Sequence, residues 1–176
     1  GAGRLAMRSA LLVMSYQQLC GLPLITMYLP MILTEQVGAT SAFECTILLH
    51  FARLLAVLLV ATRLVDSWGR RPLLLLSLLG TTAGASLLAA TYLRHPGDAL
   101  SWKLAAYLVF LMSHACGLGP VSWAYVSEAT ETRLRGKGVS TSLACSRLWS
   151  WAMITAFPAG RDRIGEGGCY LVIACL

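Results

Sequence analysis

The stretch RLVDSWGRRPLLLLS, residues 63–77, places four charged side chains within nine residues, between two long apolar runs. Residues 43–65 and residues 72–93 form these runs, and each is long enough as a helix to cross a hydrocarbon core about 30 Å thick. Pro72 suits the first turn of the second helix, where its missing N–H has no partner to lose. We therefore expect the charged stretch to be a turn at a membrane surface between two membrane-spanning helices.

The composition of the whole chain supports lipid as its solvent. Hydrophobic residues make up 57% and charged residues only 12%, about half the charged fraction typical of soluble domains. Backbone groups at membrane depth must be satisfied internally, and strand-type alternation is absent, so each span should be a helix. The sequence predicts an all-α, multi-pass integral membrane protein in contact with the lipid bilayer.

Apolar runs divide the chain into five full spans and one partial span. We expect a single transmembrane region over residues 1–176, and we expect the chain to be a fragment because it starts at Gly1 and stops at Leu176 inside an apolar run. The predicted spans are residues 6–34, 43–65, 72–93, 103–125, 139–158 and, as the opening of a sixth, 169–176.

Basic residues near the span ends predict the orientation, because they are enriched on the cytosolic side. With the N-terminal end in the cytosol, eight basic residues fall on that side and four on the other. The net charge of +6 is then explained by topology and lipid headgroups, and nucleic-acid binding is not expected. The eight are Arg4, Arg8, Arg63, Arg70, Arg71, Arg133, Arg135 and Lys137, and the four are Arg94, Lys103, Arg161 and Arg163.

The first span carries two adjacent amides, Gln17 and Gln18, in the stretch SYQQLCGLPLITMY. In a continuous helix Gln17 would share one face with Gly21, Leu24 and Tyr28. An amide at this depth is costly unless it meets a partner or a wet cavity, and it both donates and accepts hydrogen bonds. The pair therefore suits either a polyhydroxylated ligand or a bond to a neighbouring helix, with equal weight.

The fourth span contains glycines and a proline that interrupt its helix. Gly117 and Gly119 permit close backbone approach, and Pro120 removes a backbone hydrogen bond. Interrupted helices at membrane depth are typical of transporters, where they line the cavity. Trp123, just beyond, could stack on a sugar ring or anchor the helix at the interface.

The sequence offers no support for an enzyme. No span pairs a nucleophile with a base, and the six cysteines show no metal-ligand spacing. We expect reduced, buried thiols, no metal and no cofactor.

Four motifs in order resemble the sugar porter family of the major facilitator superfamily. They are QQxxG at residues 17–21, DSWGRR at residues 66–71, GxGPxxW at residues 117–123, and SE followed by RLRGKG at residues 127–138. The resemblance covers nearly the whole chain and is closest to the C-terminal six-helix half, from the seventh helix to the start of the twelfth. The RLRGKGVS loop is similar to that of fungal hexose porters.

The resemblance implies a twelve-helix protein of two halves that moves a sugar or polyol, with or without a proton, by alternating access. The partner of this chain would be the N-terminal six-helix half, and the plasma membrane would be its location. The implied substrate-binding residues are Gln17, Gln18, Gly21, Tyr28, Trp123, Ser146 and Arg147. Gly117, Gly119 and Pro120 would be the hinge, and Asp66, Gly69, Arg70, Arg71, Glu128 and Arg135 a cytosolic charge latch.

The chain departs from the family pattern at several positions. Pro23 stands where an asparagine is usual, Met27 where a tyrosine is usual, and Ser67 where an arginine is usual. Ser146 and Arg147 replace an Asn-Trp pair. These departures keep two alternatives open, a non-transporting sugar sensor and an inactive truncated paralogue.

Three ionisable residues lie inside apolar runs. Arg147 could meet an anionic substrate such as a sugar acid, or it and Arg53 could reflect drift in a nonfunctional copy, with equal weight. His114 could take part in proton coupling, but a packing or hydrogen-bonding role is more common for a lone histidine.

Overall fold

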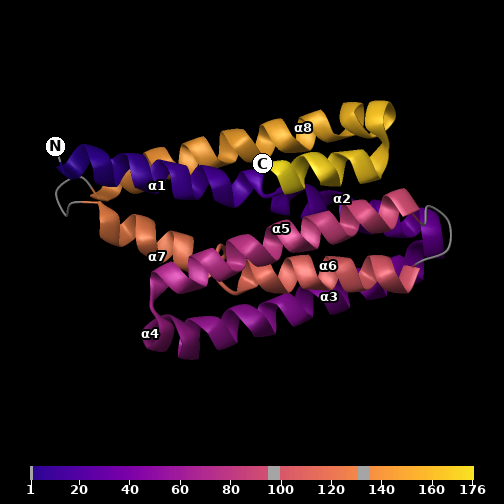
Figure 1. The fold of residues 1–176 in the computed structure, drawn as a ribbon, viewed down its shortest axis with the longest axis horizontal. Helices are drawn as coiled ribbons and strands as arrows, with labels where there is room; N and C mark the ends of the chain where they lie inside the picture. The colour runs from indigo at the N-terminus through magenta and orange to yellow at the C-terminus, as the bar shows by residue number, and fades with distance from the viewer. Residues whose placement is uncertain (1, 95–99, 131–134) are drawn as a thin grey trace.

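The computed structural model describes residues 2–94, 100–130 and 135–176, with the side chains of residues 2–5, 61 and 66 left aside. This part of the chain is almost wholly helical, and its helices run along one common long axis (Figure 1). The elements are α1 (Ala2–Leu19), α2 (Leu22–Val37), α3 (Ala39–Leu59), the π-helical η1 (Val60–Leu64), α4 (Val65–Trp68), α5 (Arg70–Arg94), α6 (Leu100–Ala115), α7 (Pro120–Ala129) and α8 (Arg135–Cys175).

The span predicted over residues 6–34 comprises two helices, α1 and α2. Gly21 separates them in a left-handed conformation, with φ 91° and ψ 3°. Pro23, which has no N–H to donate, lies in the first turn of α2. The expectation that Gln17 and Tyr28 lie on one face of a continuous helix is therefore wrong, because the helix stops between them.

α8 contains a reversal of the chain at Gly165. This glycine has φ 73° and ψ 172°, a region open essentially to glycine alone. The segment after it folds back alongside the segment before it (Figure 1, yellow). The residues predicted as a fifth span and as the start of a sixth thus lie on two antiparallel arms of α8.

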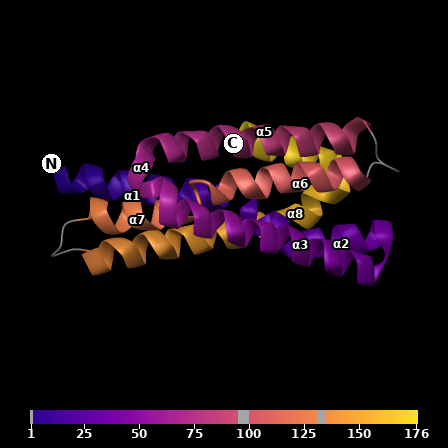
Figure 2. The same cartoon turned by 90° about the horizontal axis from the view of Figure 1, so that it is seen from below.

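Small residues allow α5 and α6 to pack closely along their length (Figure 2). A Cβ added at Gly84 would lie 2.8 Å from the Cα of Phe110, and one added at Gly80 would lie 2.6 Å from the Cβ of Ser113. Helix association in membranes depends on such small-residue contacts, since lipid and side chains are equally apolar. α5 also packs against α8, and α1 packs against α8 and α7.

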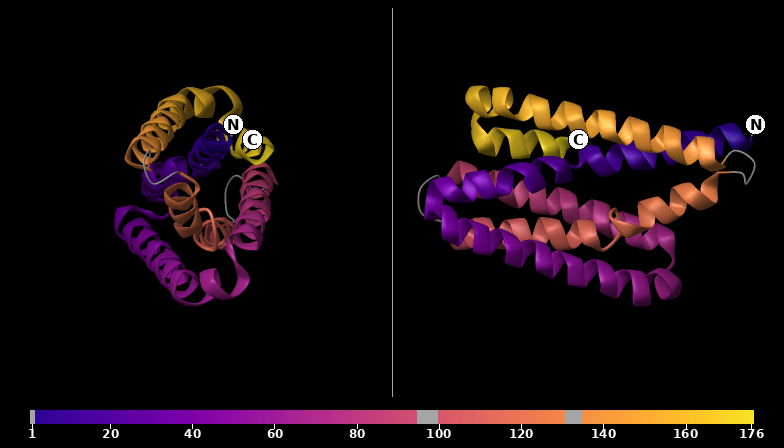
Figure 3. Two further views of the ribbon diagram at one scale, coloured as in Figure 1. Left: turned by 90° about the vertical axis from the view of Figure 1, so that its left-hand side faces the viewer. Right: turned by 180° about the vertical axis from the view of Figure 1, so that it is seen from behind.

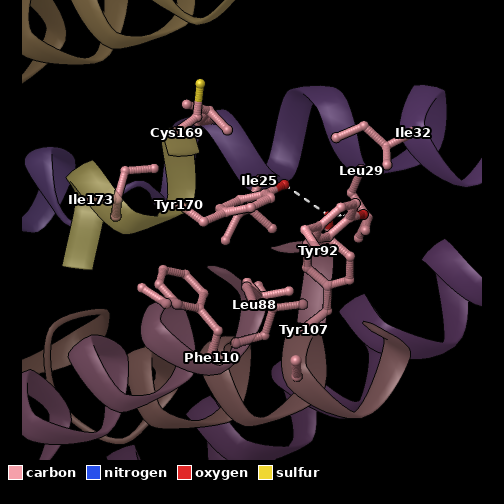
Figure 4. Close-up of a cluster of buried hydrophobic side chains, with 14 of the residues drawn as sticks. Ile25, Leu29, Ile32, Leu88, Tyr92, Tyr107, Phe110, Cys169, Tyr170 and Ile173 are labelled. Carbon is pink, nitrogen blue, oxygen red and sulfur yellow. Dashed lines mark hydrogen bonds between the residues drawn. The ribbon is translucent and has the colours of Figure 1, made fainter. Parts of the chain in front are cut away.

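The main apolar core gathers residues from α2, α5, α6 and the final arm of α8 (Figure 4). Ile25, Leu29, Leu88 and Phe110 are fully buried in it or nearly so. On the outside of the bundle, large apolar side chains such as Phe43 and Leu79 are exposed. That combination suits a protein whose outer surface meets lipid.

Four helical segments of the described chain are long and apolar enough to cross a membrane. They are Ala6–Val37, Ala39–Leu64, Arg70–Arg94 and Leu100–Ala129. The all-α fold predicted from the sequence is confirmed.

The two ends of the bundle differ in charge. The first end, which we name the α4 end, holds the N-terminus, α4 and the start of α8, and it carries Arg70, Arg71 and Arg135 (Figure 1). The second, the Gly165 end, holds the turns at Gly38 and Gly165 (Figure 3). The predicted cytosolic basic residues within the described chain thus gather at the α4 end.

Candidate functional site

An open cavity of about 630 Å³ lies where the two interrupted spans face α3 and α8. It is bordered by the junction of α1 with α2 and by the junction of α6 with α7. Its lining mixes amides, guanidinium groups and apolar side chains. The lining residues are Gln17, Gln18, Leu22, Pro23, Thr26, Met27, Arg53, Val57, His114, Gly119, Pro120, Trp123, Arg147, Ser150 and Ile154.

Four of the predicted substrate-binding residues line this cavity, namely Gln17, Gln18, Trp123 and Arg147. They come from three distant parts of the sequence, and the fold brings them to one space. Their binding role stays a prediction, but the geometry allows it.

The other three predicted residues are not among the described residues that line the cavity. Gly21 forms the turn between α1 and α2. The Tyr28 hydroxyl donates to the Ile154 carbonyl at 3.1 Å. Ser146 is fully buried and donates to the Leu143 carbonyl of its own helix at 2.8 Å.

The Gln17 side chain fulfils one of the two roles considered from the sequence, and the other, ligand binding, stays a prediction. Its Nε2 donates to the carbonyl of Leu118 at 2.7 Å and to that of Gly119 at 3.2 Å, so it bonds a neighbouring helix. Its Oε1 is buried without a hydrogen-bond partner. A residue that lines the cavity thus keeps an unused acceptor, to which a ligand hydroxyl could donate.

The junction between α6 and α7 is held by side chains from two other helices. The Ser77 hydroxyl of α5 accepts from the Leu118 N–H at 2.9 Å and donates to the Ser113 carbonyl at 2.7 Å. Gln17 of α1 satisfies carbonyls of the same junction. An interrupted helix at membrane depth requires such replacement partners.

Gly117 at this junction is required by a close backbone approach. A Cβ at this position would lie 2.2 Å from the Leu73 carbonyl oxygen. Gly119 and Pro120 border the cavity directly, and Pro120 opens α7. The hinge assignment for these three residues stays a prediction.

Arg53 and His114 also line the cavity, although the sequence analysis assigned neither to the substrate site. His114 is fully buried, with neither ring nitrogen in a hydrogen bond. The sequence did contain a signal for these two residues, because an ionisable side chain inside an apolar run is typical of a functional site at membrane depth.

Comparison with known proteins matches this arrangement to one family. The sequence model of the family described as "Sugar (and other) transporter" matches residues 2–176. The chain belongs to the sugar porter family.

Two relatives illustrate the similarity to this sugar porter chain. The protein named "Putative polyol transporter 2" of Arabidopsis thaliana is 32% identical over 170 residues, which are 90% of this chain and 32% of the relative. The galactose-proton symporter of Escherichia coli strain K12 is 29% identical over 98% of this chain and 38% of its own length. The chain therefore spans about a third of the length of these relatives.

Solved structures agree on the fold. A double-tryptophan mutant of XylE matches with a TM-score of 0.90 at 22% identity, over 99% of this chain and 37% of that chain. The proton:xylose symporter XylE bound to 6-bromo-6-deoxy-D-glucose matches with a TM-score of 0.87 at 24% identity, over 98% of this chain and 38% of that chain. The sugar porter chain thus has the fold of one half of a major facilitator superfamily protein.

Part of the predicted charge latch of this sugar porter comes together at the α4 end. Arg70 donates to the Glu128 carboxylate at 2.5 Å, with both side chains nearly half exposed. Arg71 and Arg135 are exposed and form no ion pair with the described residues. Gly69 provides the left-handed turn before α5, with φ 80°, and the Asp66 side chain lies outside the described residues.

A second charged group at the Gly165 end was missed in the sequence analysis. Arg161 contacts Glu35 at 2.5 Å and Glu166 at 2.9 Å, and so links α2 to both arms of α8. Burial raises the pKa of the Glu166 carboxyl, against the opposing effect of Arg161. The hydrogen bond to Glu35 raises the pKa of Arg161.

The sequence analysis also missed a buried polar cluster beside that group. Tyr107 shares hydroxyl hydrogen bonds with Tyr92 at 2.9 Å and with Tyr170 at 2.8 Å (Figure 4). Lys103, which was counted among the basic residues near the span ends, is fully buried and places its Nζ 4.8 Å from the centre of the Tyr92 ring. These three tyrosines lie in three separate apolar runs, and nothing in the sequence indicates that they contact one another in the fold.

Proposed function

We propose that this chain forms the C-terminal half of a secondary transporter that moves a sugar or polyol by alternating access. The observation that carries the proposal is the cavity. Its lining includes polar side chains of α1, α3 and α8 and the junctions of the two interrupted spans. Family membership supports the same function, because the relatives include proteins named for transport of polyols and galactose.

The proposed binding chemistry follows from the lining side chains. Gln18 and the Oε1 of Gln17 offer hydrogen bonds to hydroxyl groups, while Trp123 offers a flat apolar face to the ring of a sugar. Substrate would lie between this half and an N-terminal half. Residues 1–176 by themselves are then expected not to transport, because one wall of the site is absent.

The proposed cycle uses the α4 end as the contact between the halves. The Arg70–Glu128 pair would contribute to a latch that favours the outward-facing state by a few kcal/mol at most, on the scale of a conformational equilibrium. Proton coupling is proposed because relatives are named galactose-proton and D-xylose-proton symporters. We place the protein in the plasma membrane.

The proposal is tested by uptake into proteoliposomes that hold the longest gene product carrying this chain. Labelled glucose, galactose, xylose, sorbitol and inositol are supplied with and without an inward proton gradient. We expect saturable uptake of at least one compound, stimulated by the gradient. Saturable binding without uptake would favour the sensor alternative, and neither binding nor uptake would favour the inactive one.

A pair of variants separates the site from the scaffold. Gln18→Ala removes a cavity amide and is expected to reduce uptake about tenfold or more, since lost hydrogen bonds to ligand hydroxyls are each worth about 1 kcal/mol. Ser86→Ala is the matched control, because the Ser86 hydroxyl bonds only within its own helix on an exposed face. Equal uptake by the two variants would remove the amide from the site.

A further inference from the structure

Two positively charged side chains from different helices line the cavity. Arg53 of α3 and Arg147 of α8 both line it. None of the described residues that line the cavity is acidic. The ion pairs of the described residues lie at the two ends of the bundle and involve neither arginine.

Both arginines lie far from the ends of the helices that carry them. Arg53 follows Ala39 by fourteen residues and precedes Leu64 by eleven, within a span of 26 residues. At about 1.5 Å per residue it lies more than about 15 Å from either end of the span. Arg147 lies twelve residues after the start of α8 and eighteen before the reversal at Gly165.

A guanidinium at this depth is costly without a counter-charge. A lone arginine in the middle of a membrane helix costs at least about 2.5 to 3.5 kcal/mol, and two in one cavity also repel each other. A neutral polyol offers dipoles but no charge to offset this. A carboxylate offsets it directly, and the planar guanidinium binds a carboxylate through two parallel hydrogen bonds.

Uncharged polar side chains line the same cavity as the two arginines. The Oε1 of Gln17 and both ring nitrogens of His114 are buried without a hydrogen bond. Ser150 lies on the same wall as Arg147, one helical turn away. These groups can meet hydroxyls on the same ligand, so the cavity combines a place for one negative charge with places for several hydroxyls.

We propose that the preferred ligands of this cavity are polyhydroxylated carboxylates, such as sugar acids, with Arg53 and Arg147 holding the carboxylate. The proposal rests on the proposed function and narrows its substrate class. It also gives Arg147 a role where the family pattern has an uncharged side chain.

The test compares acids with neutral compounds of the same skeleton. Gluconate and sorbitol differ only in a carboxylate against a hydroxymethyl group, and so do glucuronate and glucose. Binding is measured at pH 7.5, where carboxylates are ionised, as the concentration giving half the maximal thermal shift of the purified longest gene product. Acetate is the control for a carboxylate without hydroxyls.

We expect each acid to bind about tenfold or more tightly than its neutral partner, and acetate to give no shift in that range. Arg147→Gln and Arg53→Gln should each weaken acid binding about 10- to 100-fold, the size expected for a charged hydrogen bond, with less than about threefold effect on the neutral partner. Arg147→Lys should weaken acid binding less than Arg147→Gln does. Arg94→Gln, at an exposed helix end away from this cavity, should change nothing.

Several results would overturn the proposal while leaving transport intact. The proposal is overturned if the neutral compounds bind as tightly as the corresponding acids. It is also overturned if acetate binds as tightly as gluconate. An equal loss of acid and neutral binding in Arg147→Gln would show that the arginine does not hold the carboxylate. If no compound binds and none is taken up, the proposed function itself fails. If the arginine variants do not fold, the proposal is still tested by the ratio of acid affinity to neutral-compound affinity in the unsubstituted protein.

Discussion

Two interrupted spans border the cavity, and they are built differently. The junction of α6 with α7 has backbone hydrogen bonds of its own, such as that from the Gly119 N–H to the His114 carbonyl at 2.9 Å, and it has further hydrogen bonds to Ser77 of α5 and Gln17 of α1. The junction of α1 with α2 takes its hydrogen bonds from its own chain, with the Gly21 N–H donating to the Gln18 carbonyl at 3.2 Å. One junction is cross-linked to the bundle, and the other depends on a single left-handed glycine.

The packing around Gly117 and Gly21 also indicates that the α6–α7 junction is the more tightly held of the two. Gly117 faces the backbone of α5 at Leu73, whereas Gly21 faces the buried side chain of Ile173. A backbone neighbour cannot yield without moving a helix, whereas a side chain can shift by itself, even one that is stiff at χ1 as isoleucine is. We infer that the α6–α7 junction fixes the bundle and that the α1–α2 junction is the more adaptable of the two.

The largest effect is expected for Gly117→Ala, which tests the fixed junction. Its Cβ would lie 2.2 Å from the Leu73 carbonyl oxygen and 2.7 Å from the Ser77 Cβ, so α5 and α7 must separate. We expect a loss of about 3 kcal/mol, at the upper end for overpacking, measured as a lower midpoint of thermal unfolding in detergent.

Gly136→Ala is the matched control for that variant. Gly136 lies in the first turn of α8, and a Cβ there would meet nothing within 4 Å. Its midpoint should stay the same or rise slightly, because alanine favours the helix. Equal midpoints for the two variants would show that the α6–α7 junction is not tightly held.

A smaller effect is expected for Gly21→Ala, which tests the adaptable junction. A left-handed conformation costs a non-glycine residue about 1 to 2 kcal/mol, and the Ile173 Cγ2 at 2.8 Å must also move. We expect a total loss of about 2 kcal/mol in the same unfolding measurement.

The double variant Gly21→Ala with Ile173→Ala separates these two contributions. Removing the Ile173 side chain relieves the contact but leaves the backbone strain. The combined loss should fall short of the sum of the single losses by about 1 kcal/mol, in the range of coupling between contacting residues. Strict additivity would mean that Ile173 does not restrict Gly21.

The sequence predicted the α6–α7 junction better than the α1–α2 junction for a physical reason. Two glycines and a proline within four residues cannot continue a helix, so the interruption follows from local chemistry alone. At Gly21 and Pro23 the same signal was present but weaker, because a single glycine is often tolerated inside a helix. The apolar runs on both sides therefore suggested one span.

Local sequence could not predict what holds each junction. Ser77 is an ordinary polar residue in an apolar run, and its bonds to Ser113 and Leu118 depend on α5 lying against α6. The buried cluster of Tyr92, Tyr107 and Tyr170 likewise depends on three helices that meet only in the fold. By contrast, the turn between α4 and α5 could be predicted without tertiary information, from the charged residues within 63–77 and the lengths of the apolar runs on both sides.

The smallest effect tests whether the two junctions are linked through Gln17. This residue lies in α1 four positions before Gly21, yet its Nε2 bonds carbonyls of the α6–α7 junction. Gln17→Met keeps the size of the side chain and removes the donor, and Ser77→Ala leaves the Leu118 N–H without its partner. Each is expected to cost about 1 to 2 kcal/mol.

Because both side chains hold the same short segment, the losses of Gln17→Met and Ser77→Ala should not add. Once one partner is gone, the segment can shift and loses less when the second is removed, so the combined loss should be smaller than the sum by about 0.5 to 1 kcal/mol. Gln17→Met combined with Ser86→Ala is the control and should be additive, since Ser86 bonds only within α5. Additivity in both pairs would mean that Gln17 and Ser77 act independently, and the two junctions would then be free to move without each other.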